Sequence, residues 1–167
     1  MEIFNVKLAV AATTPAVISA YWSLQNWPEI APHVCEITMH YADEAIQVLT
    51  MTVKTKGKTD AFKSVRIRQA NAIHFFQPCP PLFLSHHTGC WQFNSQGNAT
   101  VVTVEHAIEV NIPAARAFLG MNTSAINDSN TVCNSIREII SNNSLQTMTA
   151  IKVRLEKAEE HRYALAN

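Results

Sequence analysis

The stretch TVVTVEHAIEV, residues 100–110, decides the fold class of this chain because its residues alternate between two chemically different faces. One face is apolar apart from a single histidine and consists of Val102, Val104, His106, Ile108 and Val110. The other face carries Thr103, Glu105 and Glu109. Successive side chains of a strand point to opposite sides, so this pattern predicts a strand of an antiparallel sheet with one buried and one solvated face.

Upstream of this stretch, shorter runs with similar alternation follow one another with turns between them. We expect strands at residues 1–10, 35–40, 45–55, 59–69, 72–76 and 82–94. Gly89 lies inside the last of these runs and predicts a bend or a bulge there. Pro78, Pro80 and Pro81 predict a stiff connection before it.

A helix is expected between the first two strands. Thr13 followed by Thr14 and Pro15 is a helix start signal, with threonine as the N-cap and proline in the first turn. Trp27 precedes Pro28, and a residue before proline is disfavoured in the helical region of backbone conformation. We therefore expect the helix to break there and a short helix or turn to follow.

A long helix is expected after the last strand. Residues 113–127 indicate an irregular segment, and Asp128 or Ser129 can cap a helix that reaches past Glu156. Residues 141–144 are poor helix formers and predict a kink. The apolar residues recur at steps of mostly three and four, as on one face of a helix. This stripe consists of Val132, Ile136, Ile140, Met148, Ile151 and Leu155.

The order of these elements predicts an α+β fold. A run of strands followed by one long helix favours a curved antiparallel sheet that wraps around the helix, because the apolar face of the sheet needs a cover. With 167 residues, the chain has the usual size of one domain, so we expect a single domain over residues 1–167. A cavity between sheet and helix and a solidly packed core both agree with the 47 % hydrophobic composition.

The composition argues against several classes of function. The formal net charge is zero, which disfavours nucleic acid as a partner and docking on anionic membranes. The four cysteines are far apart and form no CxxC pair, so we expect neither a metal site nor a disulfide framework. No apolar run approaches the ~18 residues of a membrane span, and we expect a cytoplasmic protein.

Three stretches of the sequence resemble a known family. The first is ATTPA at residues 12–16 with LQNWPE at residues 24–29. The second is the proline pair at residues 80–81 followed by HHTGCWQF at residues 86–93, and the third is NNSLQTM at residues 142–148 with Ile151, Lys152 and Glu156. Together they are similar to the helix-grip proteins of the START-like (SRPBCC) superfamily, and specifically to its polyketide aromatase/cyclases of the tetracenomycin type.

The resemblance implies an enzyme that works without a cofactor. Such an enzyme receives a poly-β-ketone chain from an acyl carrier protein of a type II polyketide synthase and folds it in its cavity. It then promotes an intramolecular aldol closure and the loss of water, which gives an aromatic polyketide intermediate. We expect the carrier protein at the cavity mouth, with residues 114–127 as its lip, and a monomer or homodimer.

The resemblance also implies site residues. Arg66 matches the pocket arginine of the family, and His106 matches a polar position in the pocket wall, where a histidine can act as a base. Val34 occupies the place of a family tyrosine, with His33 beside it as a third catalytic candidate. A solvated arginine and a neutral core histidine remain alternatives for the first two. The expected substrate-binding residues are Trp27, Met51, Phe62, Ser64, His87, Trp91, Val104, Asn143 and Thr147.

A second class of function uses the same fold. A binding or transfer module for a quinone or lipid, similar to the coenzyme-Q-binding members of the superfamily, needs only apolar walls. A cyclase needs polar groups that converge in the cavity. Arg66 together with His106 favours the enzyme.

Overall fold

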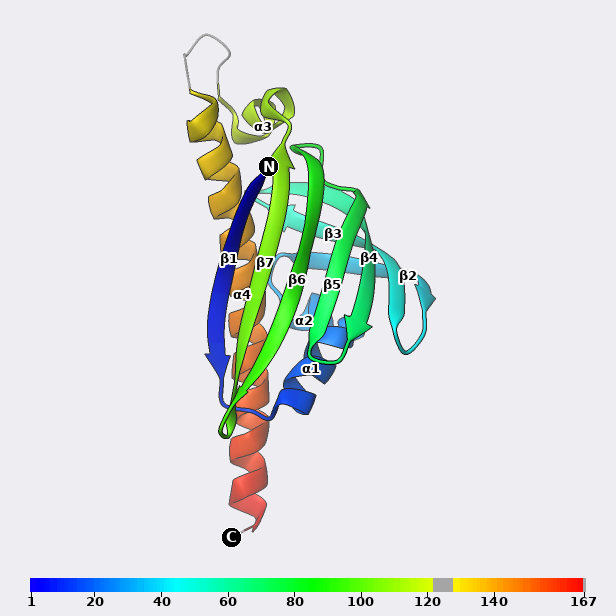
Figure 1. The fold of residues 1–167 in the computed structure, drawn as a ribbon, viewed down its shortest axis with the longest axis vertical. Coiled ribbons are helices and arrows are strands. Elements are labelled where there is room, and N and C mark those ends of the chain that lie inside the picture. Colours follow the sequence, from blue (N-terminus) through cyan, green and yellow to red (C-terminus); the bar gives the residue numbers. More distant parts are fainter. Residues whose placement is uncertain (122–127, 167) are drawn as a thin grey trace.

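The computed structural model describes residues 1–121 and 128–166, and it confirms the α+β fold with a long helix against a curved antiparallel sheet (Figure 1). The sheet has seven strands in the order β1-β7-β6-β5-β4-β3-β2, each antiparallel to its neighbours. The strands are β1 (Glu2–Val10), β2 (Val34–Ala42), β3 (Ile46–Thr55), β4 (Lys58–Gln69), β5 (Ala72–Cys79), β6 (Leu84–Gln96) and β7 (Ala99–Val110).

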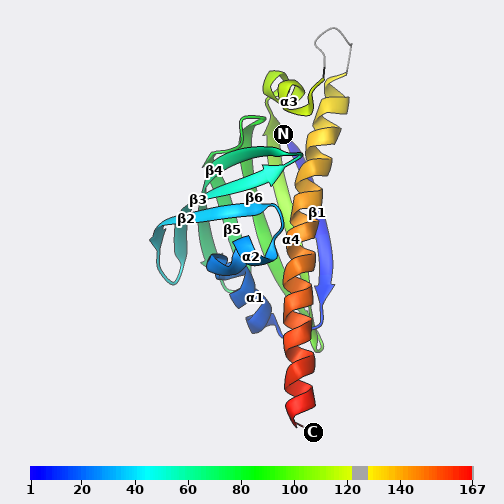
Figure 2. The ribbon, with the colours of Figure 1, turned by 180° about the vertical axis from the view of Figure 1, so that it is seen from behind.

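The helices lie against one face of this sheet. Helix α4 (Ser129–Ala166) runs the length of the molecule beside β1 and β7, and its last turns extend beyond the sheet (Figure 2). Helix α1 (Thr14–Trp22), the 3₁₀ turn η1 (Leu24–Asn26) and the short helix α2 (Trp27–Ile30) follow β1, and α3 (Ile112–Leu119) follows β7.

Two apolar clusters join the helices to the sheet. The larger cluster packs α1, α2 and the lower half of α4 on the sheet, with Tyr21, Phe93 and Met148 fully buried. The smaller cluster packs α3 and the first turns of α4, around Ile108 and Ile136. The predicted stripe of α4 is buried as expected, with Leu155 partly exposed at its end.

The structure corrects three local expectations about helices. Residues 113–119 are not irregular, because α3 begins after Asn111, whose side chain accepts a hydrogen bond from the Ala114 amide, and ends at Gly120 with φ 69°. Residues 122–127 of the expected lip lie outside the described residues.

Trp27 adopts helical angles (φ −63°, ψ −38°) and begins α2, with its indole nitrogen donating to the Ala20 carbonyl. The tertiary contacts of this buried ring outweigh the pre-proline preference. Helix α4 continues as one α-helix through residues 141–144.

The strands agree with the expected ranges except at β5, which extends three residues beyond Phe76 and includes Pro78. Gly89 is not a bulge, because it pairs in regular register with Phe75 on one side and His106 on the other. The register shift in β6 lies between Leu84 and His86 instead.

One row of paired residues crosses four central strands. Arg66 pairs with Phe75, Phe75 with Gly89, and Gly89 with His106, which in turn pairs with Phe4 on the edge strand β1. A Cβ atom at Gly89 would collide with the ring of Phe75 and with the backbone oxygen of Glu105. The glycine therefore leaves the space in which the Phe75 ring lies across the sheet.

We expect Gly89→Ala to lower the free energy of unfolding by about 2 kcal/mol, because overpacking of this kind forces side chains and backbone to shift. Urea denaturation measures the effect. Thr88→Ala, on the outer face one residue away, is the matched control and should change stability by less than about 0.5 kcal/mol. Equal stability of Gly89→Ala and the native chain would show that Phe75 does not need the glycine.

Candidate active site

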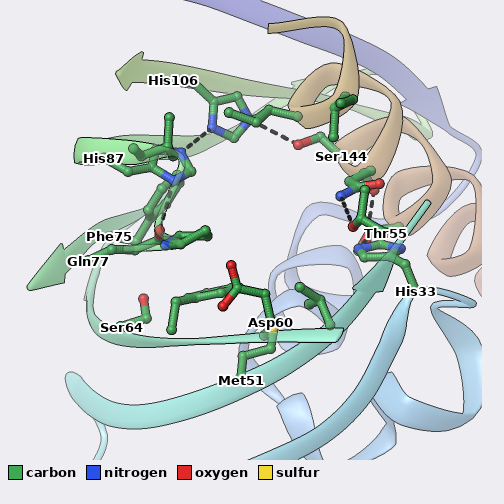
Figure 3. A pocket seen from close by; sticks show the side chains of 18 of the residues that line it. His33, Met51, Thr55, Asp60, Ser64, Phe75, Gln77, His87, His106 and Ser144 are labelled. Atoms are coloured by element: carbon green, nitrogen blue, oxygen red, sulfur yellow. Dashed lines mark hydrogen bonds between the residues drawn. The ribbon is translucent and has the colours of Figure 1, made fainter. Parts of the chain in front are cut away.

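A cavity lies between the concave face of the sheet and α4, at the level where the two apolar clusters meet (Figure 3). Its interior holds about 150 Å³ of space for water-sized guests. The walls are mostly apolar, with Trp27, Met51 and Phe75 among them. The polar side chains of the wall are His33, Thr55, Lys58, Asp60, Ser64, Arg66, Gln77, His87, His106, Asn143, Ser144 and Thr147.

Arg66 on β4 is buried at one end of this cavity, with 5 % of its surface exposed. Its Nη1 donates to Gln47 Oε1 at 2.7 Å and to the Trp22 carbonyl at 3.5 Å, and its Nη2 donates to the Tyr21 carbonyl. These two carbonyls belong to the last turn of α1, so the cation meets the negative end of the helix dipole. The guanidinium also lies over the rings of Trp22 and Trp27, 5.2 and 5.8 Å from their centroids.

The charge of Arg66 has an unusual environment. Among the described residues, its hydrogen-bond partners are neutral oxygens rather than carboxylates. Burial lowers its pKa to about 9, which leaves the group positively charged at neutral pH. A buried cation without a carboxylate partner favours any anionic oxygen that enters the cavity.

His106 on β7 lies at the other end of the cavity, within a continuous chain of hydrogen-bonding side chains (Figure 3). Gln77 Oε1 is 2.9 Å from His87 Nδ1, and His87 Nε2 is 3.0 Å from His106 Nδ1. His106 Nε2 is 2.9 Å from Ser144 Oγ on α4. Burial lowers the pKa of His106 to about 4, so its ring is neutral at pH 7.

His87 is neutral for related reasons. Burial lowers its pKa to about 3, with smaller contributions from the charges that His106 and His86 would carry. Two adjacent imidazoles cannot both be protonated in a site of low dielectric constant without a large cost in free energy.

A second polar group lines the cavity near α2 and α4. His33 Nε2 is 3.4 Å from Thr147 Oγ1, while His33 Nδ1 is buried with no hydrogen-bond partner among the described residues. Burial lowers the pKa of His33. Asn143 Nδ2 donates to Thr55 Oγ1 at 3.2 Å, which joins α4 to the end of β3. His33 therefore lines the cavity together with Thr147, and its partnerless Nδ1 is buried in the wall.

The mouth of the cavity is narrowed by a contact between β4 and α3. Lys58 Nζ donates to the carbonyls of Ala117 and Phe118 at 3.3 and 2.8 Å, and it lies 5.3 Å from the centroid of the Phe118 ring. Phe118 in turn packs on Phe83 with ring centroids 4.5 Å apart. This contact, rather than Arg116, is what α3 brings to the cavity wall in the described residues.

The structure brings nearly all of the expected site residues into one cavity. The three catalytic candidates Arg66, His106 and His33 all line it. The expected substrate-binding residues that also line it are Trp27, Met51, Phe62, Ser64, His87, Trp91, Asn143 and Thr147. Val104 is fully buried in the larger apolar cluster.

Gln77 and Ser144 are the functional candidates that sequence reasoning missed. Gln77 lies on the same inward face of β5 as Ile73 and Phe75. Extending the expected strand through Pro78 would have placed it in the cavity. Ser144 lies one turn after Ile140 on the buried face of α4, and its small polar side chain suggested a kink rather than a site.

In residues 1–121 and 128–166, no three His, Cys, Asp or Glu side chains are grouped closely enough to hold a metal ion. The four cysteines are free thiols. No helix in the described part of the chain is long and apolar enough to cross a membrane.

Known proteins are similar to this chain in sequence or in architecture. No family model matches the chain. The bifunctional cyclase/dehydratase of the actinorhodin polyketide synthase from Streptomyces coelicolor is 30 % identical over 134 residues, which are 73 % of this chain and 40 % of that protein. The chain thus spans less than half of this relative.

Two solved structures extend the comparison. The di-domain aromatase/cyclase of the steffimycin biosynthetic pathway superposes with a TM-score of 0.84 at 23 % identity, over 95 % of this chain and 52 % of that one. A START superfamily protein from Mycobacterium smegmatis superposes with a TM-score of 0.73 at 14 % identity, over 93 % of this chain and 98 % of that one. At these identities the superpositions establish the fold. The chain therefore has the fold of the aromatase/cyclase and of the START superfamily protein, and it is similar in sequence to the actinorhodin cyclase/dehydratase.

Proposed function

We propose that this chain is a cofactor-independent polyketide cyclase/aromatase. In this proposal it binds a poly-β-ketone chain carried by an acyl carrier protein, closes a ring by regiospecific aldol condensation and promotes the loss of water that makes the ring aromatic. Residues 1–167 act as one domain of a kind that the actinorhodin and steffimycin relatives carry within longer chains.

One observation supports this proposal above the others. Arg66 and His106 lie three strands apart in one register row, and both line the same mostly apolar cavity. At an inter-strand spacing of ~4.8 Å, their backbones are separated by about 14 Å. A quinone- or lipid-binding module would need neither a buried cation nor a neutral base in its cavity.

The two groups divide the chemistry between them. Arg66 can hold a ketone oxygen and stabilise the negative charge that develops on it as the enolate forms. His106 is neutral, so it can accept the acidic proton that lies between two carbonyl groups. The apolar walls exclude water and select one conformer of a chain that otherwise closes in several ways.

The size of the cavity fits one ring-forming segment rather than a whole substrate. Space of about 150 Å³ holds roughly one benzene-sized group. The remainder of the chain would then pass the Lys58–Phe118 contact to the carrier protein outside. We place the carrier protein at this mouth, next to α3.

The first test of this function replaces Arg66. In a reconstituted synthase, Arg66→Ala should slow the directed cyclisation by about 10²–10³, since one preorganised donor is lost. Because poly-β-ketones also cyclise without help, the visible result is a shift to shunt products, which liquid chromatography with mass detection measures. Arg66→Lys keeps the charge but lacks the planar fork, so it should restore little.

The matched control is Arg68→Ala, on the same strand but exposed to solvent. Arg66 also donates hydrogen bonds to carbonyls in the last turn of α1, so its replacement removes contacts that stabilise the fold. Circular dichroism therefore has to show that each variant is folded. An unchanged product profile in folded Arg66→Ala would refute the assigned role and favour the binding module.

The second test is the pH dependence of the reaction. A base must be unprotonated, and burial lowers the pKa of His106 to about 4. Activity should therefore be constant from neutral pH down to about 5 and fall as the pH drops through about 4, whereas a solvated histidine would lose activity near 6.5. The groups that face His106 are His87 on β6 and Ser144 on α4, and Arg137 lies over the ring of Phe4 next to it.

Folding stability changes with pH in the same range. Below pH ~6.5 the unfolded chain binds more protons than the folded one, so stability is full above that pH and is lost as the pH falls towards 4. Circular dichroism at each pH separates this loss from the loss of activity. An activity midpoint near 6.5 in folded protein would contradict a buried neutral base.

A further inference from the structure

Four side chains from three strands and α4 form one hydrogen-bonded chain across the cavity wall. They are Gln77 on β5, His87 on β6, His106 on β7 and Ser144 on α4, and the three contacts between them measure 2.9, 3.0 and 2.9 Å. All four are buried, with exposures of 8 % or less. Such a buried network has a definite donor and acceptor at each contact.

The direction of this chain follows from its first member. Gln77 presents its amide oxygen to His87, and an amide oxygen only accepts, so His87 Nδ1 carries the hydrogen. A neutral imidazole has one N–H, so His87 Nε2 is an acceptor and His106 Nδ1 must donate to it. His106 Nε2 then has the free lone pair, and it accepts from the hydroxyl of Ser144.

Packing holds both rings in this orientation. Phe4 stacks on His106 with centroids 5.2 Å apart. Phe75 meets the edges of His87 and His106 at 5.3 and 5.7 Å, in the space that Gly89 leaves open. The histidines are therefore oriented by aromatic contacts as well as by their hydrogen bonds.

Ser144 is oriented towards the cavity rather than along its own helix. A helical serine or threonine commonly donates to the carbonyl four residues earlier, and Thr147 does so to Asn143 at 3.2 Å. The Ser144 hydroxyl instead lies 2.9 Å from His106 Nε2. Ser144 is the last member of the hydrogen-bonded chain and lines the cavity, as the other three members do.

We propose that Gln77 and His87 are positioning residues that fix His106 in its Nδ1–H tautomer, and that the Ser144 hydroxyl carries protons between His106 Nε2 and the substrate. This inference rests on the proposed function. The inference goes beyond the proposed function in three assignments. It names the atom of His106 that accepts the proton, the two residues that select this atom, and the hydroxyl that contacts the substrate.

The proton transfers balance over each step. In the aldol step, Ser144 Oγ takes a proton from the carbon between two carbonyls while its own proton moves to His106 Nε2. The freed electron pair forms the new C–C bond, and the π pair of the attacked ketone moves to its oxygen, which receives the proton back through Ser144. In the dehydration, a second C–H proton is taken in the same way, a C=C bond forms, and the hydroxyl leaves as water with the returned proton. Nothing is oxidised or reduced, and the chain returns to its starting state.

The experiment measures the tautomer of His106 by ¹⁵N nuclear magnetic resonance of the free protein, and the kinetic constants of cyclisation in parallel. The native protein should show His106 protonated on Nδ1 and unprotonated on Nε2. Gln77→Met has a similar size but only a weakly accepting thioether, so it should release His87 and convert His106 partly or wholly to the Nε2–H form. The kcat should fall about tenfold or more, with KM nearly unchanged, by analogy with the loss seen when the outer partner of a metal-bound histidine is removed.

Two further variants separate positioning from stability. Gln77→Glu keeps an acceptor for His87 Nδ1 and should preserve the native tautomer. Ser144→Ala should leave the tautomer unchanged but lower kcat, because only the final proton carrier is missing. His74→Gln, on the exposed outer face of the same strand as Gln77, is the control and should change neither measurement.

The outcomes distinguish this inference from the proposed function. Protonation of His106 on Nε2 in the native protein would mean that the chain runs in the opposite direction and would overturn the inference, whatever the activity. An unchanged tautomer and kcat in Gln77→Met would overturn it as well. Absence of cyclisation by the native protein, together with the expected tautomers, would refute the function while leaving the positioning by Gln77 and His87 established.

Discussion

The packing of one helix against a concave sheet is the constraint on which the site depends. A sheet that curves around α4 encloses more space than the side chains of a single helix fill. The chain fills both ends of this space, with α1 and α2 at one end and α3 at the other. The gap between the two apolar clusters is the cavity, and there the apolar stripe of α4 is interrupted by Ser144 and Thr147.

Strand register sets the positions of the groups around this gap. Arg66, Phe75, Gly89 and His106 occupy one row of paired residues, so their spacing is fixed by backbone hydrogen bonds rather than by a loop. Each group is then restrained by neighbours: Arg66 by the end of α1, and His106 by aromatic rings and His87. A site built in this way keeps its polar groups apart while both face the same apolar space.

The sequence was informative where alternation decides orientation, and less so where tertiary contacts override local preference. Parity along the strands placed His87 and His106 inward correctly. It missed Gln77 because Pro78 suggested that the strand had ended, although β5 tolerates the proline. Trp27 adopts helical angles despite Pro28 because its buried ring and indole hydrogen bond compensate. The signals that bound α3, Asn111 and Gly120, were present in the sequence, but the segment after Pro113 was expected to be irregular. No local pattern could reveal that Ser144 meets His106, since the two are 38 residues apart.

The distribution of tryptophans around Arg66 has an optical consequence. The chain has three tryptophans, and all of them lie close to Arg66 or to Tyr21, whose carbonyl Arg66 binds. Trp27 and Trp91 line the cavity, and Trp22 lies under the guanidinium together with Trp27. The intrinsic fluorescence of the protein therefore originates beside the binding space. A conjugated aromatic guest that enters it comes close enough to absorb or quench that emission, so the native chain carries its own reporter of occupancy without any attached dye.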